Sequence, residues 1–240
     1  MARYGLIGFP LINRQSADYF QRKFASHEGA NTYSNYPLES LKYLPELVIA
    51  EQLSGFSVTI PYKEEILNHL SQIDSEAGNV GAVNTVKITS HGWIGYNTDV
   101  VGFKNSLLPL LLPHHQKALI LGTGGAAKAV AYVLKSLEIP YQMISRDENK
   151  GLNYLSLTAD LIREHLLLIN ASPVGMGHLK DQAPQIPYEG ITQQHLVYDL
   201  IYLPEKTIFL SMAEARGASI KNGMEMLHLQ ADKAFDIWIK

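Results

Sequence analysis

The chain has 240 residues, of which 46% are hydrophobic and 18% charged, values typical of a folded globular protein. Its formal net charge is -3, whereas nucleic-acid-binding proteins usually carry an excess of basic residues, so we expect no nucleic-acid partner. The absence of cysteine excludes disulfides and thiolate chemistry and agrees with a reducing compartment, which we expect to be the cytoplasm. No apolar segment is long enough to span a bilayer, so we expect no membrane association.

Short apolar segments alternate with amphipathic ones along the chain, which is typical of α/β proteins with mostly parallel sheets. In the first part of the chain, the predicted strands are 4–7, 32–36 and 55–60. A helix is predicted over 16–25, with Ser16 as its N-cap, and helical spacing resumes over 63–70 after Pro61.

The middle of the chain is predicted to form a hairpin and then leave the first domain. Segments 83–88 and 93–96 flank the turn sequence 89–92, which indicates two antiparallel strands. A helix predicted over 99–111 follows, and 113–116 is expected to link it to the next unit.

The second half repeats the strand-helix alternation, with predicted strands at 118–121, 141–144, 166–170 and 196–200. A final helix begins at Met224. Its apolar face is formed by Met224, Leu227, Ala231, Ala234, Phe235 and Trp238. We expect this helix to pack on the first domain, which makes that domain discontinuous: residues 1–100 with 223–240, around a doubly wound, Rossmann-like domain at 101–222.

A glycine-rich turn follows the strand at 118–121 and precedes a predicted helix over 126–137. It reads Gly-x-Gly-x-x-Ala from Gly122 to Ala127, a pattern that permits a tight turn and a close approach of backbone to a pyrophosphate. Free N–H groups at the start of the helix favour phosphate. The residues predicted to contact a dinucleotide here are Gly122, Gly124, Gly125 and Ala126.

The next strand ends at Ser145, and the three residues that follow it bear on which cofactor is bound. Arg146 can pair with the 2′-phosphate of NADP, whereas a carboxylate at this point would accept the ribose hydroxyls of NAD. Asp147 and Glu148 are both present, so NADP is favoured and NAD stays possible. Ser145 and Arg146 are the predicted cofactor-binding residues of this segment.

Hydride transfer to a ketone requires a proton donor beside the cofactor, and two segments offer suitable groups. Lys63 follows a strand end, and Asp99 follows the second hairpin strand. Between them, Asn84 and Thr85 supply an amide and a hydroxyl. From the chemistry alone, Lys63 and Asp99 are interpreted equally well as functional groups of a site or as a structural ion pair.

The order of these segments resembles the shikimate dehydrogenase family over almost the whole chain. The matching pieces are Gly8-x-Pro10, Ser57–Lys63, Gly81–Thr85, Asn97–Asp99, Gly122–Ala126, Asn170–Met176, Tyr198–Tyr202, and Asn222–Leu227 with Gln230. The resemblance implies a reversible, NADP-linked reduction of 3-dehydroshikimate to shikimate, in the biosynthesis of chorismate and aromatic amino acids. It also implies an N-terminal α/β substrate domain beside the dinucleotide-binding domain.

The resemblance also assigns roles to individual residues. Lys63 and Asp99 become the catalytic pair, in which the lysine shuttles the proton and the carboxylate holds it and a substrate hydroxyl in place. The positions implied to bind substrate are Ser16, Thr59, Asn84, Tyr202 and Gln230. Those implied to lie along the dinucleotide are Asn170, Ser172, Gly223 and Met224.

The sequence departs from the family in the segment that holds the substrate carboxylate. The family pattern His-Ser-x-Ser-Pro is replaced by Asn13-Arg14-Gln15-Ser16-Ala17, and the family's Asn-Val-Thr begins with Ser57. Arg14 is interpreted either as a bidentate partner of the carboxylate or as a surface residue. Open alternatives are therefore another cyclic polyol carboxylate, such as quinate, or a non-catalytic sensor of dinucleotide or metabolite. We expect no metal, and a monomer or homodimer.

Overall fold

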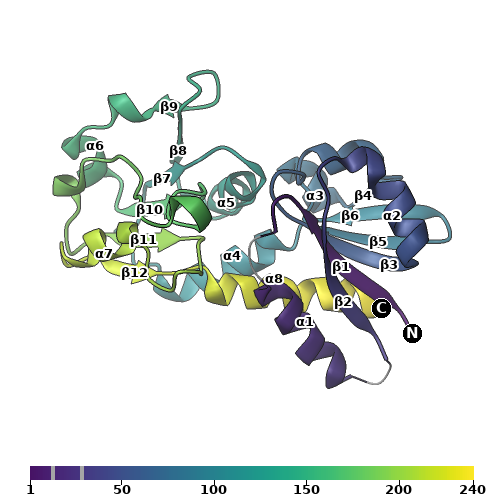
Figure 1. Ribbon diagram of the computed structural model, residues 1–240. Helices are drawn as coiled ribbons and strands as arrows, with labels where there is room; N and C mark the ends of the chain where they lie inside the picture. The colour runs from purple at the N-terminus through teal and green to yellow at the C-terminus, as the bar shows by residue number, and fades with distance from the viewer. Residues whose placement is uncertain (12–13, 28–29) are drawn as a thin grey trace. The chain divides into compact units, whose positions relative to one another are not determined.

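The computed structural model describes residues 1–11, 14–27 and 30–240 (Figure 1). The chain divides into two compact units, Met1–Gly102 with His228–Lys240, and Phe103–Leu227. Each unit is built on its own sheet with helices against it, so the predicted mixed α/β fold is confirmed.

The first unit contains, among its described residues, a six-stranded sheet in the order β2-β1-β3-β5-β6-β4. The strands are β1 (Arg3–Gly8), β2 (Thr32–Pro37), β3 (Leu53–Val58), β4 (Gln72–Ile73), β5 (Thr85–Thr89) and β6 (Gly92–Tyr96). β1 pairs in parallel with β2 and β3, whereas β5 runs antiparallel to both β3 and β6. The β5–β6 pair is the predicted hairpin.

Helices cover both faces of this sheet. They are α1 (Gln15–Ala25), α2 (Leu44–Glu51), α3 (Ser75–Val80) and, from His228 onward, α8 (Met224–Ile239). On one face, α1 and α8 enclose an aromatic cluster with β1, in which Trp238 stacks on Tyr4 at 4.8 Å between ring centroids. The Trp238 indole N–H donates to the carbonyl oxygen of Val86 at 3.0 Å, which fixes the last helix on the sheet. The expectation that the C-terminal helix packs on the first sheet is therefore confirmed.

The predicted cap of the first helix is wrong. α1 begins at Gln15, with Arg14 at the cap position and no side-chain cap bond. Ser16 therefore lies inside the first turn, where its backbone is already helical and its hydroxyl no longer occupies the position that satisfies a free N–H.

Other boundaries also differ from the prediction, three of them as follows. Residues 63–70 contain only a short 3₁₀ helix, Glu65–His69, in which Ile66 alone is fully buried, so little packing favours a longer helix. β3 ends at Val58, two residues before its predicted end. α4 (Asp99–Leu107) gives way to a 3₁₀ turn over Leu108–Leu110 because proline in that turn cannot donate an intrahelical hydrogen bond.

The second unit has, within its described residues, a six-stranded sheet in which every pairing is parallel, in the order β12-β11-β10-β7-β8-β9. Its strands are β7 (Ala118–Leu121), β8 (Tyr141–Ser145), β9 (Leu152–Asn153), β10 (Leu167–Asn170), β11 (Leu196–Asp199) and β12 (Ser219–Lys221). Its helices include α5 (Gly125–Ser136), α6 (Ala159–Glu164) and α7 (Ile208–Glu214). All residues of β7, β10 and β11 are buried, as expected for parallel strands covered on both faces.

The strand order of the second sheet reverses beside β7. The chain proceeds from β7 to β8 and β9 on one side, then crosses to β10 and β11 on the other side. Ligands of such sheets bind at the carboxyl ends of the strands next to this reversal. Gly122 directly follows β7, and Asn170 is the last residue of β10, so both lie at that position.

Candidate active site

The first unit brings Lys63 and Asp99 together. Lys63 lies in the loop after β3, and Asp99 is the first residue of α4. The lysine Nζ is 2.6 Å from Asp99 Oδ2, and the two side chains are only 15% and 7% exposed. The backbone beside the pair is tied to the loop before β5, because the carbonyl oxygen of Lys63 accepts from the N–H of Val83 at 2.8 Å.

Asn84 holds the second carboxylate oxygen of Asp99. Its Nδ2 donates to Asp99 Oδ1 at 2.9 Å and to Thr98 Oγ1 at 2.9 Å. Its Oδ1 accepts from the backbone N–H of Thr98 at 2.7 Å and from Thr85 Oγ1 at 3.2 Å. Because donors face the amide oxygen and acceptors face the amide nitrogen, the orientation of this side chain is determined.

Gln230, on α8, reaches the same group of side chains. Its Oε1 accepts from Thr98 Oγ1 at 3.3 Å and from Asn84 Nδ2 at 3.4 Å. Lys63, Asp99, Asn84, Thr98 and Gln230 form what we call the lysine network. Thr98 is the one member of this network that was not predicted as a site residue, although its position between an amide and a carboxylate in Asn97–Asp99 was a usable signal.

The other predicted substrate residues of this unit lie outside the lysine network. Thr59 is half-buried, and its N–H donates to the carbonyl oxygen of Ile7 at 2.9 Å. Ser16 is half-buried in the first turn of α1. Arg14 is exposed, with its Nε 4.0 Å from Asp18 Oδ1. Asn13 of the altered family motif lies outside the described residues.

In the second unit, Gly122 and Gly124 have different surroundings, and only Gly122 is constrained to glycine by the fold. Gly122 has a φ of +122°, and a Cβ there would lie 3.0 Å from the carbonyl oxygen of Ala171, so backbone and packing both demand glycine. Gly124 has an ordinary φ of -81°, and a Cβ there would meet nothing within 4 Å. The open space at Gly124 precedes α5, whose first N–H groups attract anions. This turn therefore fits a dinucleotide pyrophosphate.

Asn170 and Ser172 shape the loop that follows β10. Asn170 is fully buried, and its Oδ1 accepts from the backbone N–H of Ser172 at 3.1 Å and from its Oγ at 2.7 Å. The Asn170 Nδ2 donates to the carbonyl oxygen of Val174 at 3.0 Å. The side chain of Asn170 thus organises the loop beside the Gly122 turn.

After β8, the local contacts separate the arginine from the two carboxylates. Asp147 Oδ2 lies 3.8 Å from Lys150 Nζ, and Glu148 Oε1 accepts from Asn153 Nδ2 at 3.1 Å. Arg146 is exposed and forms no ion pair with any carboxylate in the described part of the chain. The carboxylates are therefore occupied within their own turn, whereas the guanidinium is accessible to an anion.

The remaining predicted residues of this unit are placed as follows. The Ser145 hydroxyl is buried and accepts from the N–H of Asp147 at 3.0 Å. Tyr202 is half-buried in the loop after β11. A Cβ on Gly223 would lie 2.0 Å from the carbonyl oxygen of Leu200, so packing demands glycine there. Met224, half-buried, begins α8.

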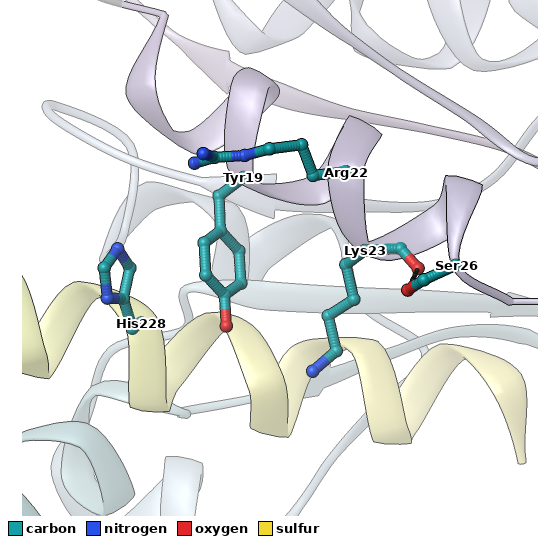
Figure 2. Close-up of a pocket in the computed structure, with 5 residues that line it drawn as sticks. All are labelled: Tyr19, Arg22, Lys23, Ser26 and His228. Carbon is teal, nitrogen blue, oxygen red and sulfur yellow. Dashed lines mark hydrogen bonds between the residues drawn. The ribbon is translucent and has the colours of Figure 1, made fainter.

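A separate hollow of about 420 Å³ lies where α1 meets α8, and Figure 2 shows Tyr19 and Lys23 directed from α1 toward α8. Its lining residues are Tyr19, Arg22, Lys23, Ser26 and His228. The Tyr19 hydroxyl donates to Asp232 Oδ1 at 2.6 Å, Lys23 pairs with the same carboxylate, and the Tyr19 ring stacks on His228. None of the predicted site residues lines this hollow, and Tyr19 and Lys23 join the two helices through Asp232.

Residues 1–11, 14–27 and 30–240 lack two features. No group of three or more His, Asp or Glu side chains is placed to hold a metal ion. No helix in these ranges has both the length and the apolar character needed to cross a bilayer.

Comparison with known proteins places this geometry in a family. The family model for the shikimate dehydrogenase substrate binding domain matches residues 6–86. A curated relative from Staphylococcus aureus, named shikimate dehydrogenase (NADP(+)), is 34% identical, covering 98% of this chain and 92% of its own. The solved shikimate 5-dehydrogenase of Thermus thermophilus, in complex with NADP(H) and shikimate, is 30% identical with a TM-score of 0.87, covering 99% and 93% of the two chains.

A quinate dehydrogenase from Corynebacterium glutamicum, in complex with NAD, is also similar. It has 26% identity and a TM-score of 0.86, covering 99% of this chain and 93% of its own. The similarity to the curated relative covers nearly the full length of both proteins, so it spans the segments that carry the lysine network and the Gly122 turn. The chain belongs to the shikimate dehydrogenase family.

Proposed function

We propose that the protein is an NADP-dependent dehydrogenase that interconverts 3-dehydroshikimate and shikimate. Its main support is the lysine network, in which a largely buried ammonium, a carboxylate and two amides meet in a chain that belongs to this family. The lysine network provides the proton donor that carbonyl reduction requires, with little water to compete.

In this proposal, Lys63 moves the proton. Its ammonium donates to the carbonyl oxygen as the ketone is reduced, and the neutral amine takes the proton back in the reverse direction. Asp99 holds the ammonium through Oδ2, while Asn84 holds Oδ1, so the carboxylate cannot rotate away. Gln230, joined to this group through Thr98, supplies an amide to the substrate hydroxyls together with Tyr202 and Thr59.

The cofactor is assigned to the second unit. NADP, when bound, accepts or supplies the hydride. The Gly122–Gly125 turn and the start of α5 would hold the pyrophosphate, and Arg146 would pair with the 2′-phosphate. NAD stays possible, because the exposed Asp147 carboxylate could accept the ribose hydroxyls while it stays near Lys150. Ser145, Asn170, Ser172, Gly223 and Met224 remain predicted dinucleotide residues.

The two compact units correspond, in this proposal, to a substrate domain and a dinucleotide-binding domain. The match of the substrate-domain family model to residues 6–86 supports the first assignment, and the parallel sheet with its Gly122 turn supports the second. Action in the cytoplasm, as a monomer or homodimer, completes the proposal and agrees with a sequence free of cysteine.

Quinate, or another cyclic polyol carboxylate, is the second candidate substrate. It is favoured by the altered carboxylate segment, in which Arg14 replaces a family serine and is exposed at the start of α1, beside Ser16. A guanidinium pairs with a carboxylate through two parallel hydrogen bonds, so the same acid group is held with different geometry. The similarity to a quinate dehydrogenase is consistent with this alternative.

Initial rates with shikimate and quinate, each under saturating NADP or NAD, test the proposal. We expect turnover of shikimate with NADP at the highest kcat/KM of the four combinations. Turnover of quinate alone would overturn the substrate assignment and leave the reaction type intact. Tight binding of NADP without turnover of either acid would instead support a sensor that has lost catalysis.

A further inference from the structure

A fully buried carboxylate ends β11, and the proposed reaction does not use it. Asp199 Oδ1 accepts from Asn170 Nδ2 and from the backbone N–H of Ile201, each at 3.0 Å, and Oδ2 accepts from Thr207 Oγ1 at 2.7 Å. No lysine or arginine in the described part of the chain pairs with it. Burial raises the pKa of Asp199 to about 7, although all of these donors oppose the rise.

The three donors come from two loops at the carboxyl edge of the second sheet. Asn170, the last residue of β10, leads into a loop whose backbone is close to the Gly122 turn: a Cβ on Gly122 would lie 3.0 Å from the carbonyl oxygen of Ala171. Ile201 and Thr207 belong to the loop after β11, which also carries Tyr202. Asp199 is therefore the common acceptor for the segment beside the glycine turn and the segment that leads to Tyr202.

Above its pKa, the ionised Asp199 carboxylate suits three converging donors, because it accepts hydrogen bonds at both oxygens and donates none. An asparagine of the same shape would direct its NH₂ group at one of these donors and leave it unsatisfied. The side chain of Asn170 depends on this arrangement, because with its Nδ2 held by Asp199 its Oδ1 faces Ser172.

We propose that Asp199 is a positioning residue for dinucleotide binding, acting through Asn170 on the loop 170–175 beside the Gly122 turn. The inference rests on the proposed function, because it assigns the pyrophosphate to that turn. This positioning role differs from a purely structural one in its consequence. Loss of the Asp199 carboxylate displaces the loop 170–175 and weakens cofactor binding in a protein that stays folded.

The test measures the Kd for NADP by isothermal titration calorimetry, which does not depend on turnover, together with the Tm of each variant. For Asp199→Asn we expect a Kd raised on the order of tenfold, the equivalent of about 1.4 kcal/mol and within the cost of one unsatisfied buried donor. The kcat at saturating NADP should fall less than the affinity does.

A second set of variants covers the case in which Asp199→Asn does not fold. Thr207→Val removes the donor to Asp199 Oδ2 and also the cap of α7, where Thr207 Oγ1 accepts from the N–H of Leu210 at 3.3 Å. Thr207→Ser retains both bonds and should restore affinity for NADP. Thr158→Val is the matched control, because Thr158 caps α6 by accepting from the N–H of Leu161 at 3.2 Å without contacting Asp199.

We expect Thr207→Val to weaken NADP binding severalfold, and Thr158→Val to lower Tm without changing the Kd. Wild-type Kd values in the folded Thr207→Val and Asp199→Asn variants would overturn the positioning role alone. Equal losses of affinity in Thr207→Val and Thr158→Val would also overturn it, since they would reflect general destabilisation. Failure of the wild-type protein to bind NADP would instead overturn the proposed function, and this inference with it.

Discussion

Replacing Lys63 with methionine removes the ammonium from the lysine network while keeping a side chain of similar length. Asp99 then loses its partner at 2.6 Å but retains the hydrogen bond from Asn84 at 2.9 Å. The carboxylate thus stays partly satisfied, and we expect the variant to fold. The reaction loses its proton donor, and no other cation in the described chain is within salt-bridge distance of Asp99.

The size of the expected effect follows from what the ammonium does. Loss of a positioned acid–base group lowers kcat by about 10²- to 10⁴-fold. This range corresponds to roughly 3 to 5 kcal/mol in the activation barrier. The Kd for NADP should change little, because Lys63 belongs to the first unit and the glycine turn to the second.

The assay is spectrophotometric turnover of shikimate with NADP, combined with titration of NADP in the absence of substrate. Lys87→Met is the control, since Lys87 is a half-buried lysine of the same unit whose Nζ donates to the carbonyl oxygen of Ile237 at 2.9 Å. This variant should lose stability and keep a normal kcat. A Lys63→Met enzyme with kcat within a few-fold of wild type, or with normal kcat and weakened NADP binding, would refute the assignment.

Three further predictions address the cofactor turn and the pH dependence of stability. Arg146→Ala should weaken NADP binding by about tenfold, because one charge-assisted contact to the 2′-phosphate is lost, and it should leave NAD binding nearly unchanged. Equal losses of affinity in titrations with both cofactors would contradict the 2′-phosphate role. Gly124→Ala should keep the wild-type Tm and bind NADP more weakly. Gly122→Ala should lower the Tm, because residue 122 has a positive φ. An unchanged Kd for NADP in Gly124→Ala would contradict the pyrophosphate site. Burial lowers the pKa of His195 in the folded protein. Between that pKa and about 6.5, the unfolded chain therefore binds more protons than the folded protein does. The free energy of unfolding should rise with pH across this window and decrease on acidification. Urea denaturation at several pH values should show a shallower slope for His195→Gln, and an unaltered slope would exclude His195 as its source.

Local sequence was sufficient for the elements whose signals are short-range. The strand 118–121 has the predicted bounds, because a run of apolar residues ending at glycine defines a buried parallel strand. The hairpin followed from its turn residues, and the last helix from its apolar period. The start of α1 was predicted less well, since Arg14 occupies a cap position for which its side chain makes no bond.

The identity of the reacting groups was also present in the sequence. Lys63, Asn84 and Asp99 stand out as polar residues at the ends of predicted strands, and their order along the chain resembles one family. The role of Asp199 was not evident from the sequence, because three donors converge on it only after β10, β11 and α7 have packed. The sequence likewise did not show that Asp147 and Glu148 are engaged by neighbouring side chains while Arg146 is accessible.

The sequence by itself determined which strands and helices form and which side chains are available for chemistry, because both depend on residues close together in the chain. Only the tertiary structure decided that Asn84 and Gln230, 146 positions apart, share a hydrogen bond, and that the Lys63 ammonium meets the Asp99 carboxylate. These contacts arise because apolar faces, such as that of the last helix on β1, pack together and carry the polar groups with them. Long-range packing therefore converts a set of candidate residues into a single lysine network.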